Sequence, residues 1–357
     1  MLIGFDGGDA NTLPRVGSGR YGYEILKHLI PLGDSYQVYL NRQPLSDMPK
    51  GECVNYKCLS PSFLWTQIAL PLDLYGGQPR PGVFFTPTHY APRFSPIPRV
   101  ITIFDLSFLK PEFQSFFRPR DLWQLKSWTA YSVAKAIHIL TISEYSKRDI
   151  INFYRIPEGR ITVTYLGPDI LPVSKGKTAR KRKKPYLLFM GTLQPRKNLE
   201  RLIEAFEILK DKDLELVIAG KRGWLFDSIF AKAQSSDASQ RIHFLDYVPE
   251  KELLGLFTGA EAFVLPSLYE GFGIPILNAM VSSVPIVASN VSSLPEIVGD
   301  AGVLIDPYDV TSIAAGIEKA LQDRDNLVRE GKRRVKKLSW ELCAQRTHEV
   351  LKKVFHG

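Results

Sequence analysis

The chain has 357 residues, of which 45% are hydrophobic and 11% aromatic, and this composition excludes a disordered or fibrous protein. The length exceeds what one hydrophobic core usually serves, so two domains are expected. The formal net charge is +9, but seven positive charges lie between Lys175 and Lys184, and the rest of the chain carries only +2. That distribution argues against a nucleic-acid-binding surface spread over the whole protein.

The targeting and redox signals favour a soluble, cytoplasmic protein. Cys53, Cys58 and Cys343 form an odd set without metal-type spacing, which is typical of free thiols in a reducing compartment. Residues 1–6 lack the basic region of a signal peptide. The longest charge-free run, 271–295, is interrupted by prolines and is not typical of a membrane span.

The first half alternates short apolar runs with amphipathic segments, which predicts a doubly wound α/β domain. The predicted strands are 2–5, 36–40, 82–85, 100–103, 139–142 and 160–165. The predicted helices are 23–30, 122–138 and 143–151. Trp123, Trp128 and Tyr131 lie at helical spacing in the second of these, a pattern typical of core packing.

Ligands of such sheets bind at the carboxyl ends of the strands, and three loops there hold candidate residues. Gly17 and Gly19 precede helix 23–30, where a plain turn is the alternative interpretation. His89 follows strand 82–85, where it either binds a ligand or is simply solvated. Asp105 follows strand 100–103 and is placed to cap the next turn.

The second half repeats the alternation after the basic run. Predicted strands are 185–190, 214–219, 242–245, 262–265 and 285–288, and predicted helices are 200–210, 252–258, 274–280 and a final helix that begins near Trp340, a packing residue. We therefore predict domains at 1–172 and 185–338, followed by a final helix at 339–357. Residues 173–184 are interpreted as a solvated linker, and contact with an anionic membrane face or a phosphorylated acceptor is the alternative.

The loop after strand 262–265 has the features of a ligand site. Glu270, Gly271, Phe272 and Gly273 lie between the strand end and a helix with Pro275 in its first turn. Glycines let backbone N–H groups approach a ligand closely, and a helix N-terminus suits a phosphate. A carboxylate beside such a site fits a nucleotide-sugar, although a strand–loop–helix without a ligand is also common.

Residues 270–280, EGFGIPILNAM, and 284–307, VPIVASNVSSLPEIVGDAGVLIDP, resemble the donor-site signature of the retaining glycosyltransferases of family 4. The resemblance extends over most of the chain. It implies the GT-B fold, with two Rossmann-like domains facing a cleft and helix 339–357 packing back on the first domain. It also implies transfer of a hexose to a glycan or lipid-linked glycan. Because mannosyltransferase-like members are the most similar, GDP-mannose is the expected donor, with no cofactor or metal.

The resemblance also implies roles for individual residues. Glu270 would hold the donor sugar, while Lys197, Arg196 and the Gly273–Ile274 backbone would stabilise the leaving diphosphate. His89 and Asp105 are candidate acceptor residues. The further donor-binding residues would be Gly17, Gly19, Thr192, Lys221, Tyr247, Val248, Gly271, Phe272 and Asn278.

Three positions depart from the family pattern. Phe104 stands where a histidine near the donor sugar is usual, Thr192 where an arginine is frequent, and Asn278 where a second glutamate meets the ribose. Arg196 is a candidate replacement for the missing arginine, and an amide bonds ribose hydroxyls without the added strength of charge. These departures leave a donor-binding or scaffold protein without turnover as the rival hypothesis, but the retained Glu270 and Lys197 favour an enzyme.

Overall fold

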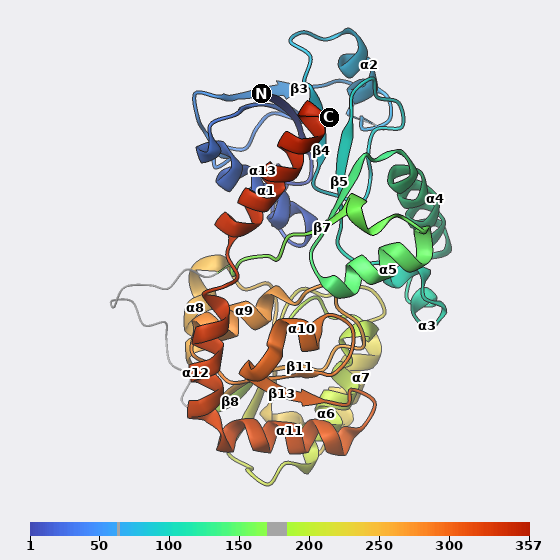
Figure 1. Cartoon of the computed structure of the whole chain (residues 1–357). Helices are drawn as coiled ribbons and strands as arrows, with labels where there is room; N and C mark the ends of the chain where they lie inside the picture. The colour runs from blue at the N-terminus through green and yellow to red at the C-terminus, as the bar shows by residue number, and fades with distance from the viewer. Residues whose placement is uncertain (63–64, 170–183) are drawn as a thin grey trace. The chain divides into compact units, whose positions relative to one another are not determined.

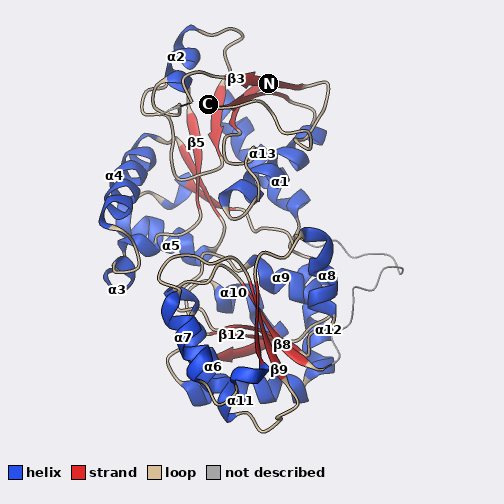
Figure 2. Ribbon diagram, turned by 180° about the vertical axis from the view of Figure 1, so that it is seen from behind, coloured by secondary structure: helices blue, strands red, loops and turns tan. Residues whose placement is uncertain are grey.

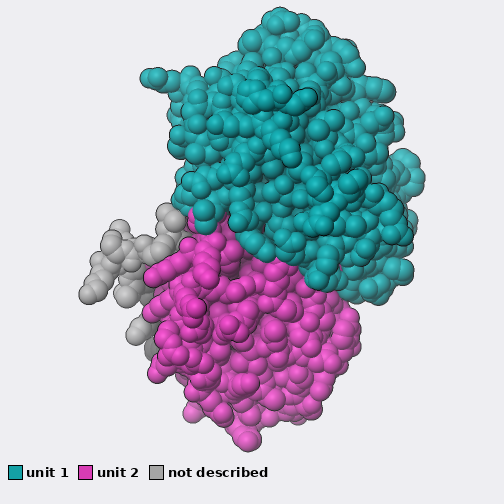
Figure 3. Space-filling model, viewed as in Figure 1, with its two compact units in different colours: residues 1–165, 340–357 teal, residues 166–339 magenta. Residues whose placement is uncertain are grey.

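The computed structural model describes residues 1–62, 65–169 and 184–357. The chain divides into two compact units, one made of residues 1–165 and 340–357 and the other of residues 166–339 (Figure 3). The basic run predicted as a linker lies outside the described residues, except for Lys184. The last helix, α13 (Trp340–His356), belongs to the first unit, so the chain returns to that unit at its end (Figure 1).

Within the described residues, seven parallel strands form the sheet of the first unit, in the order β3-β2-β1-β4-β5-β6-β7. The winding direction reverses between β1 and β4, and ligands of open α/β sheets bind at such a point. The strands are β1 (Leu2–Asp6), β2 (Ser35–Leu40), β3 (Val54–Cys58), β4 (Val83–Thr86), β5 (Arg99–Ile103), β6 (His138–Thr141) and β7 (Ile161–Val163).

Strand β3 was not predicted from the sequence. It reads VNYKC, it lies at the edge of the sheet beside β2, and none of its residues is fully buried. An edge strand packs against the core on fewer sides than a central strand, so it does not need the continuous apolar run that identifies β1 or β4.

Helices cover both faces of this sheet. On one face α1 packs against α13, where the Trp340 ring lies 6.2 Å from the ring of Tyr21, in agreement with the predicted packing role of Trp340. On the other face, Val133 of α4 and Ile150 of α5 join a core cluster with the strand residue Ile101. The helices are α1 (Ser18–Leu29), α2 (Ala69–Gly76), α3 (Pro111–Gln114), α4 (Pro119–Lys135), α5 (Glu144–Tyr154) and α13.

Helix α4 corrects two predictions. It ends at Lys135 and not at His138, which is the first residue of β6. Trp123 is 65% exposed, so the three aromatic residues do not form a core stripe. Leu122 and Leu125 contact the core instead, and Trp123 is rotated about 100° from Leu122 around the helix.

The second unit has, within its described residues, six parallel strands in the order β10-β9-β8-β11-β12-β13. This order repeats that of the first unit, with β8 in the place of β1 and β11 in the place of β4. The strands are β8 (Tyr186–Met190), β9 (Glu215–Ala219), β10 (Ile242–Leu245), β11 (Ala262–Leu265), β12 (Ile286–Ser289) and β13 (Gly302–Ile305), the last of which was not predicted.

Helices also lie on both sides of the second sheet (Figure 2). Helix α6 packs on α11, and α9 packs on α12. No helix in the described part of the chain is both long and apolar enough to cross a membrane. The helices are α6 (Leu199–Ile208), α7 (Asp227–Ser235), α8 (Glu250–Thr258), α9 (Ile274–Val281), α10 (Leu294–Val298), α11 (Val310–Gln322) and α12 (Arg324–Val335).

Candidate active site

Glu270 lies in the loop that joins β11 to α9, and hydrogen bonds fix it at three points. Its Oε1 accepts hydrogen bonds from Ser267 Oγ at 2.7 Å and from Lys197 Nζ. Its backbone N–H donates to Ser292 Oγ at 2.9 Å, and its carbonyl accepts from Ser293 Oγ at 2.9 Å. The residue is only 7% exposed, so this carboxylate has one defined position.

The charge of Glu270 is set by two opposing effects. Burial alone acts to raise the pKa of its carboxyl group. The positive charges of Lys197 and Arg196, with hydrogen bonds from Lys197 and Ser267, outweigh burial and hold the pKa of Glu270 below its ordinary value. The side chain is therefore an ionised carboxylate at neutral pH.

The two cations come from the loop after β8, which is next to β11 in the sheet. Arg196 and Lys197 lie in a 3-10 turn, Pro195–Lys197. The two loops are joined through Arg196, whose Nη1 donates to the Tyr269 carbonyl at 3.1 Å and whose own carbonyl accepts from Leu268 N–H at 2.9 Å. The reversal of winding between β8 and β11 thus brings these predicted charges together.

Asn198 is a structural residue of this site that the sequence did not indicate. It has a positive φ of 59° and immediately precedes α6, a conformation that asparagine adopts more readily than most residues. Its amide donates hydrogen bonds to the carbonyls of Pro266 at 3.0 Å and Pro307 at 2.7 Å. The buried side chain of Asn198 therefore fixes the positions of three loops relative to one another.

The start of α9 needs a glycine at position 273. Gly273 has φ +98°, and a Cβ there would lie 3.1 Å from Ile276 and 3.2 Å from Leu294. The loop residues Tyr269, Phe272 and Gly271 are buried, so the predicted contact of Phe272 with the donor would use backbone atoms. Gly273 and Ile274 present the first N–H groups of α9, which lack partners within the helix.

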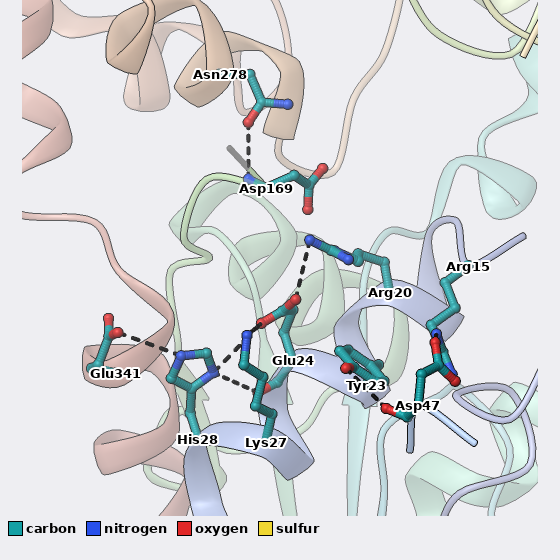
Figure 4. A network of polar contacts seen from close by, with 10 residues as sticks. All are labelled: Arg15, Arg20, Tyr23, Glu24, Lys27, His28, Asp47, Asp169, Asn278 and Glu341. Carbon is teal, nitrogen blue, oxygen red and sulfur yellow. Dashed lines mark hydrogen bonds and ion pairs between the residues drawn. The ribbon is translucent and has the colours of Figure 1, made fainter. Parts of the chain in front are cut away.

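Asn278, predicted to meet the ribose, lies inside α9 and is 1% exposed. Its Oδ1 accepts a hydrogen bond from the backbone N–H of Asp169 at 2.9 Å (Figure 4). This amide oxygen thus fixes the backbone of Asp169 against α9, and the contact with ribose remains a prediction.

The remaining predicted donor-binding residues of the second unit lie in loops along the same edge of the sheet. A Cβ at Gly220 would lie 1.9 Å from the Gly191 carbonyl oxygen, so the loops after β9 and β8 touch. This contact places Lys221, which is exposed, close in the fold to Thr192. Tyr247 and Val248 follow β10, the outermost strand, and Tyr247 is 50% exposed.

The glycine loop of the first unit follows β1. Gly17 has φ +53° and directly precedes α1, whereas Gly19 lies in the first turn of α1 and not before the helix as predicted. A Cβ at Gly19 would lie 2.9 Å from the Asp9 carbonyl oxygen. Asp6, at the end of β1, was not predicted as a site residue. Burial, reinforced by the charge of Asp9 and opposed by a hydrogen bond from Gly8 N–H, raises the pKa of Asp6 to about 7.

Ion pairs on α1 fix the helix behind this loop (Figure 4). The buried Glu24 accepts from Arg20, with Nη2 and Oε1 3.1 Å apart. His28 lies between Glu24, at 3.6 Å, and Glu341 of α13, at 3.4 Å. These contacts connect α1 to α13 within the first unit.

The candidate acceptor residues lie at the ends of β4 and β5. Asp105 Oδ1 accepts from Ser107 N–H at 2.9 Å and from Ser107 Oγ at 2.7 Å, so this carboxylate caps the turn after β5 as the sequence predicts. His89 Nε2 accepts from the backbone N–H of Phe104 at 3.1 Å. His89 and Asp105 therefore belong to one neighbourhood on the first unit, around position 104.

The described parts of the chain show neither a disulfide nor a metal site. Cys53, Cys58 and Cys343 are free thiols. Among the described residues, no group of three or more His, Cys, Asp or Glu side chains is arranged to hold a metal ion.

Solved structures with the same fold cover the whole chain. Sucrose-phosphate synthase from Thermosynechococcus elongatus matches with a TM-score of 0.79 and 16% identity, over 100% of this chain and 99% of that one. HepE from Anabaena, in complex with UDP, matches with a TM-score of 0.74 and 17% identity, over 99% of each chain. At such identities the similarity shows the fold, which is GT-B.

Sequence relatives extend the similarity beyond the fold. The O-antigen chain mannosyltransferase B of Escherichia coli is 36% identical over 287 residues, which are 76% of this chain and 74% of that protein. The MMP alpha-(1->4)-mannosyltransferase of Mycolicibacterium hassiacum is 31% identical over 62% of this chain and 55% of that protein. The family model of the glycosyl transferases group 1 matches residues 172–337, which contain Lys197 and Glu270. The chain therefore belongs to the group 1 glycosyltransferases and is a transferase of the GT-B fold.

Proposed function

We propose that this glycosyltransferase moves mannose from GDP-mannose to a glycan or lipid-linked glycan, with retention of the anomeric configuration and without a metal ion. Two relatives named as mannosyltransferases, at 36% and 31% identity, support the choice of sugar. The observation that carries the proposal is the buried Glu270 carboxylate paired with Lys197 beside Arg196.

The donor sugar would be held by the free side of Glu270. Both side-chain hydrogen bonds to its carboxylate, from Lys197 and Ser267, fall on Oε1. In the described part of the chain no hydrogen bond falls on Oε2, so this oxygen is available to accept from a sugar hydroxyl. An ionised acceptor forms a stronger hydrogen bond than a neutral one, which favours a ligand rich in hydroxyl groups.

The diphosphate would be held by fixed positive charge. Lys197 and Arg196 are positioned by the loop after β8, and the first N–H groups of α9 begin at Gly273. When the bond between the sugar C1 and the phosphate oxygen breaks, negative charge grows on that oxygen. Preorganised cations and backbone donors stabilise this charge, and they can do so in place of a metal ion.

The acceptor reaction would occur on the face of the sugar from which the nucleotide departs. The acceptor oxygen forms a bond to C1 while the bond from C1 to the phosphate oxygen breaks. The proton of the acceptor hydroxyl passes to the departing phosphate oxygen, so no histidine base is needed. Because the new bond replaces the old one on the same face, the configuration at C1 is retained.

A transfer assay in the presence of EDTA tests the proposal. The purified protein is supplied with GDP-mannose, UDP-glucose or UDP-N-acetylglucosamine and a mannose-terminated acceptor, and the product anomer is identified by NMR. We expect transfer from GDP-mannose with retention, and a loss of at least about 100-fold in kcat for Glu270→Gln.

A matched control is Glu200→Gln, which changes an exposed carboxylate in the first turn of α6 and should leave kcat unchanged. Full activity of Glu270→Gln would show that the site assignment is wrong. An inverted product, or activity abolished by EDTA, would contradict the proposed mechanism.

A further inference from the structure

The imidazole of His89 has a defined tautomer. His89 follows β4, and its Nε2 accepts a hydrogen bond from the backbone N–H of Phe104, at the end of the neighbouring strand β5. A ring nitrogen that accepts a hydrogen bond carries no hydrogen, and a neutral imidazole has one donor and one acceptor nitrogen. The proton of His89 therefore lies on Nδ1.

The ring is also held in place by aromatic contacts. It stacks on Phe104, with ring centroids 5.7 Å apart and 27° between the planes, and it lies 6.2 Å from Phe108. Phe104 is itself fixed by an edge contact with Tyr21 at 5.1 Å and by a hydrogen bond from Ser146 Oγ to its carbonyl at 2.9 Å. The imidazole is thus preorganised, with its Nδ1–H pointing in one direction.

Burial keeps this imidazole neutral. It lowers the pKa of His89 below its ordinary value, although the charge of Asp105 acts in the opposite direction. A neutral ring with a fixed tautomer cannot exchange the roles of its nitrogens without breaking the hydrogen bond to Phe104.

Among the described residues, the Nδ1–H group has no hydrogen-bond partner. Nδ1 is removed from solvent, and among the described residues no acceptor lies within reach. Buried polar groups are almost always paired in native proteins, so an unpaired one needs an explanation such as a bound ligand. His89 also lies in the loop after β4, the strand that adjoins β1 where the winding of the sheet reverses, and ligands bind at that edge.

We propose that His89 is a substrate-binding residue whose Nδ1–H donates a hydrogen bond to a sugar hydroxyl, either of the donor hexose or of the acceptor. The inference rests on the proposed function, because it takes a sugar as the ligand. Position 104, where the family resemblance led us to expect a histidine, holds a phenylalanine. The adjacent loop supplies an imidazole that stacks on that phenylalanine.

The competing explanation is that His89 only supports the Phe104 backbone through Nε2. Two amide substitutions separate these roles, because each reproduces one ring nitrogen. Asparagine places its terminal amide group near the position of Nδ1, so His89→Asn keeps a donor for the substrate. Glutamine reaches the position of Nε2, so His89→Gln keeps an acceptor for Phe104 N–H.

The experiment measures the melting temperature, kcat, and the KM values for donor and acceptor in the wild type, His89→Asn, His89→Gln and His89→Phe. We expect His89→Asn to stay within about 5-fold of the wild-type kcat/KM and the other two variants to lose about 10- to 100-fold. His89→Gln should keep the wild-type melting temperature. A rise in the KM for GDP-mannose assigns the hydroxyl to the donor, and a rise in the KM for the acceptor assigns it to the acceptor.

The opposite pattern, an active His89→Gln and an inactive His89→Asn, would show a purely structural role and overturn the proposal. Wild-type kinetics in all three variants would overturn it as well. Binding of GDP alone, measured by calorimetry, should be unchanged in every His89 variant, because the inferred contact is to a sugar and not to the nucleotide. Failure of the proposed function looks different, since the wild type itself would then show no transfer.

Discussion

The two sheets have the same order of strands around their point of reversed winding, but the residues at that edge differ in kind. In the second unit the loops after β8 and β11 bring together Lys197, Arg196 and an ionised Glu270. In the first unit the end of β1 holds Asp6, whose pKa is raised to about 7, and the loop after β4 holds a neutral His89. One topology thus forms a charged edge, where an ionised acid lies against two cations, and a second edge where burial favours the neutral forms of Asp6 and His89.

The difference follows from what surrounds each titratable group. The Glu270 carboxylate is buried against two cations, so its charged form is favoured. Asp6 is buried beside another acid, Asp9, so its neutral form is favoured. The charged edge suits a diphosphate, and the neutral forms of Asp6 and His89 suit hydrogen bonds with sugar hydroxyls. Four predictions, in order of expected effect, test this contrast.

Removing the cation from the charged edge should have the largest effect. Lys197→Met leaves the Glu270 carboxylate buried without its main partner, and the pKa of Glu270 should rise. Breaking such a pair typically costs about 3–5 kcal/mol in the free energy of unfolding. Adding Glu270→Gln should restore most of that loss, as measured by urea denaturation at pH 7.

The first unit offers the control for this change. Lys147 pairs with Glu158 at 2.7 Å, but the Glu158 side chain is 74% exposed. Lys147→Met should therefore leave stability almost unchanged, since exposed ion pairs contribute little. Equal losses for the two lysine variants would contradict the view that Glu270 is buried as an ion.

The two edges should also respond to pH in opposite directions. Glu270 has a lowered pKa, so its contribution to stability is present above the ordinary pKa of glutamate and is lost as the pH falls through its folded value. Asp6 has a raised pKa, so its protonated form stabilises the fold at low pH and stability falls as the pH rises from about 4 to 7.

The Asp6 effect can be measured in one variant. Between pH 5 and pH 8 the wild type should lose about 3 kcal/mol of unfolding free energy through Asp6, and Asp6→Asn should lack this loss. Asp9→Asn should reduce it, because the charge of Asp9 contributes to the raised pKa. Identical pH profiles for the wild type and Asp6→Asn would refute the assignment of a raised pKa.

Backbone contact between loops is tighter at the charged edge. Gly220 has φ +145°, and a Cβ there would lie 1.9 Å from the Gly191 carbonyl oxygen. Gly220→Ala should cost on the order of 3 kcal/mol, through both strain and overlap. At Gly19 the Cβ would lie 2.9 Å from the Asp9 carbonyl oxygen, so Gly19→Ala should cost about 1 kcal/mol. Thermal denaturation that ranks the two variants in the reverse order would count against this geometry.

Single hydroxyl groups should give the smallest effects. Ser267 donates to the charged Glu270 and Ser146 donates to the neutral carbonyl of Phe104. Because hydrogen bonds to charged groups are stronger, Ser267→Ala should cost about 2 kcal/mol and Ser146→Ala about 1 kcal/mol. Chemical denaturation of both variants measures the two losses in unfolding free energy. Equal losses would indicate that the charge of Glu270 does not strengthen its hydrogen bond with Ser267.

Much of the fold could be predicted because buried parallel strands read as continuous apolar runs. That signal identified the central strands β1 and β4 and their counterparts β8 and β11, and it failed for β3, whose edge position tolerates polar residues. Glu270 and Lys197 could be identified because each lies in a recognisable local motif.

The rest of the site depends on contacts between distant loops. Asn198 donates hydrogen bonds to Pro266 and Pro307, and Asn278 accepts one from Asp169. These partners are far apart in the sequence. The direction of the His89 Nδ1–H follows from a backbone group at position 104. No local pattern encodes such partners, since they arise only when the sheet brings the strand ends together.

The most direct test of the donor site is amide hydrogen exchange, followed by mass spectrometry, with and without saturating GDP-mannose. Binding is confirmed beforehand by calorimetry. We predict slower exchange in residues 191–198 and 268–276 of the second unit, where the loops of Lys197 and Glu270 lie. Bound donor with unchanged exchange in both segments would contradict the assignment of the donor site to this edge.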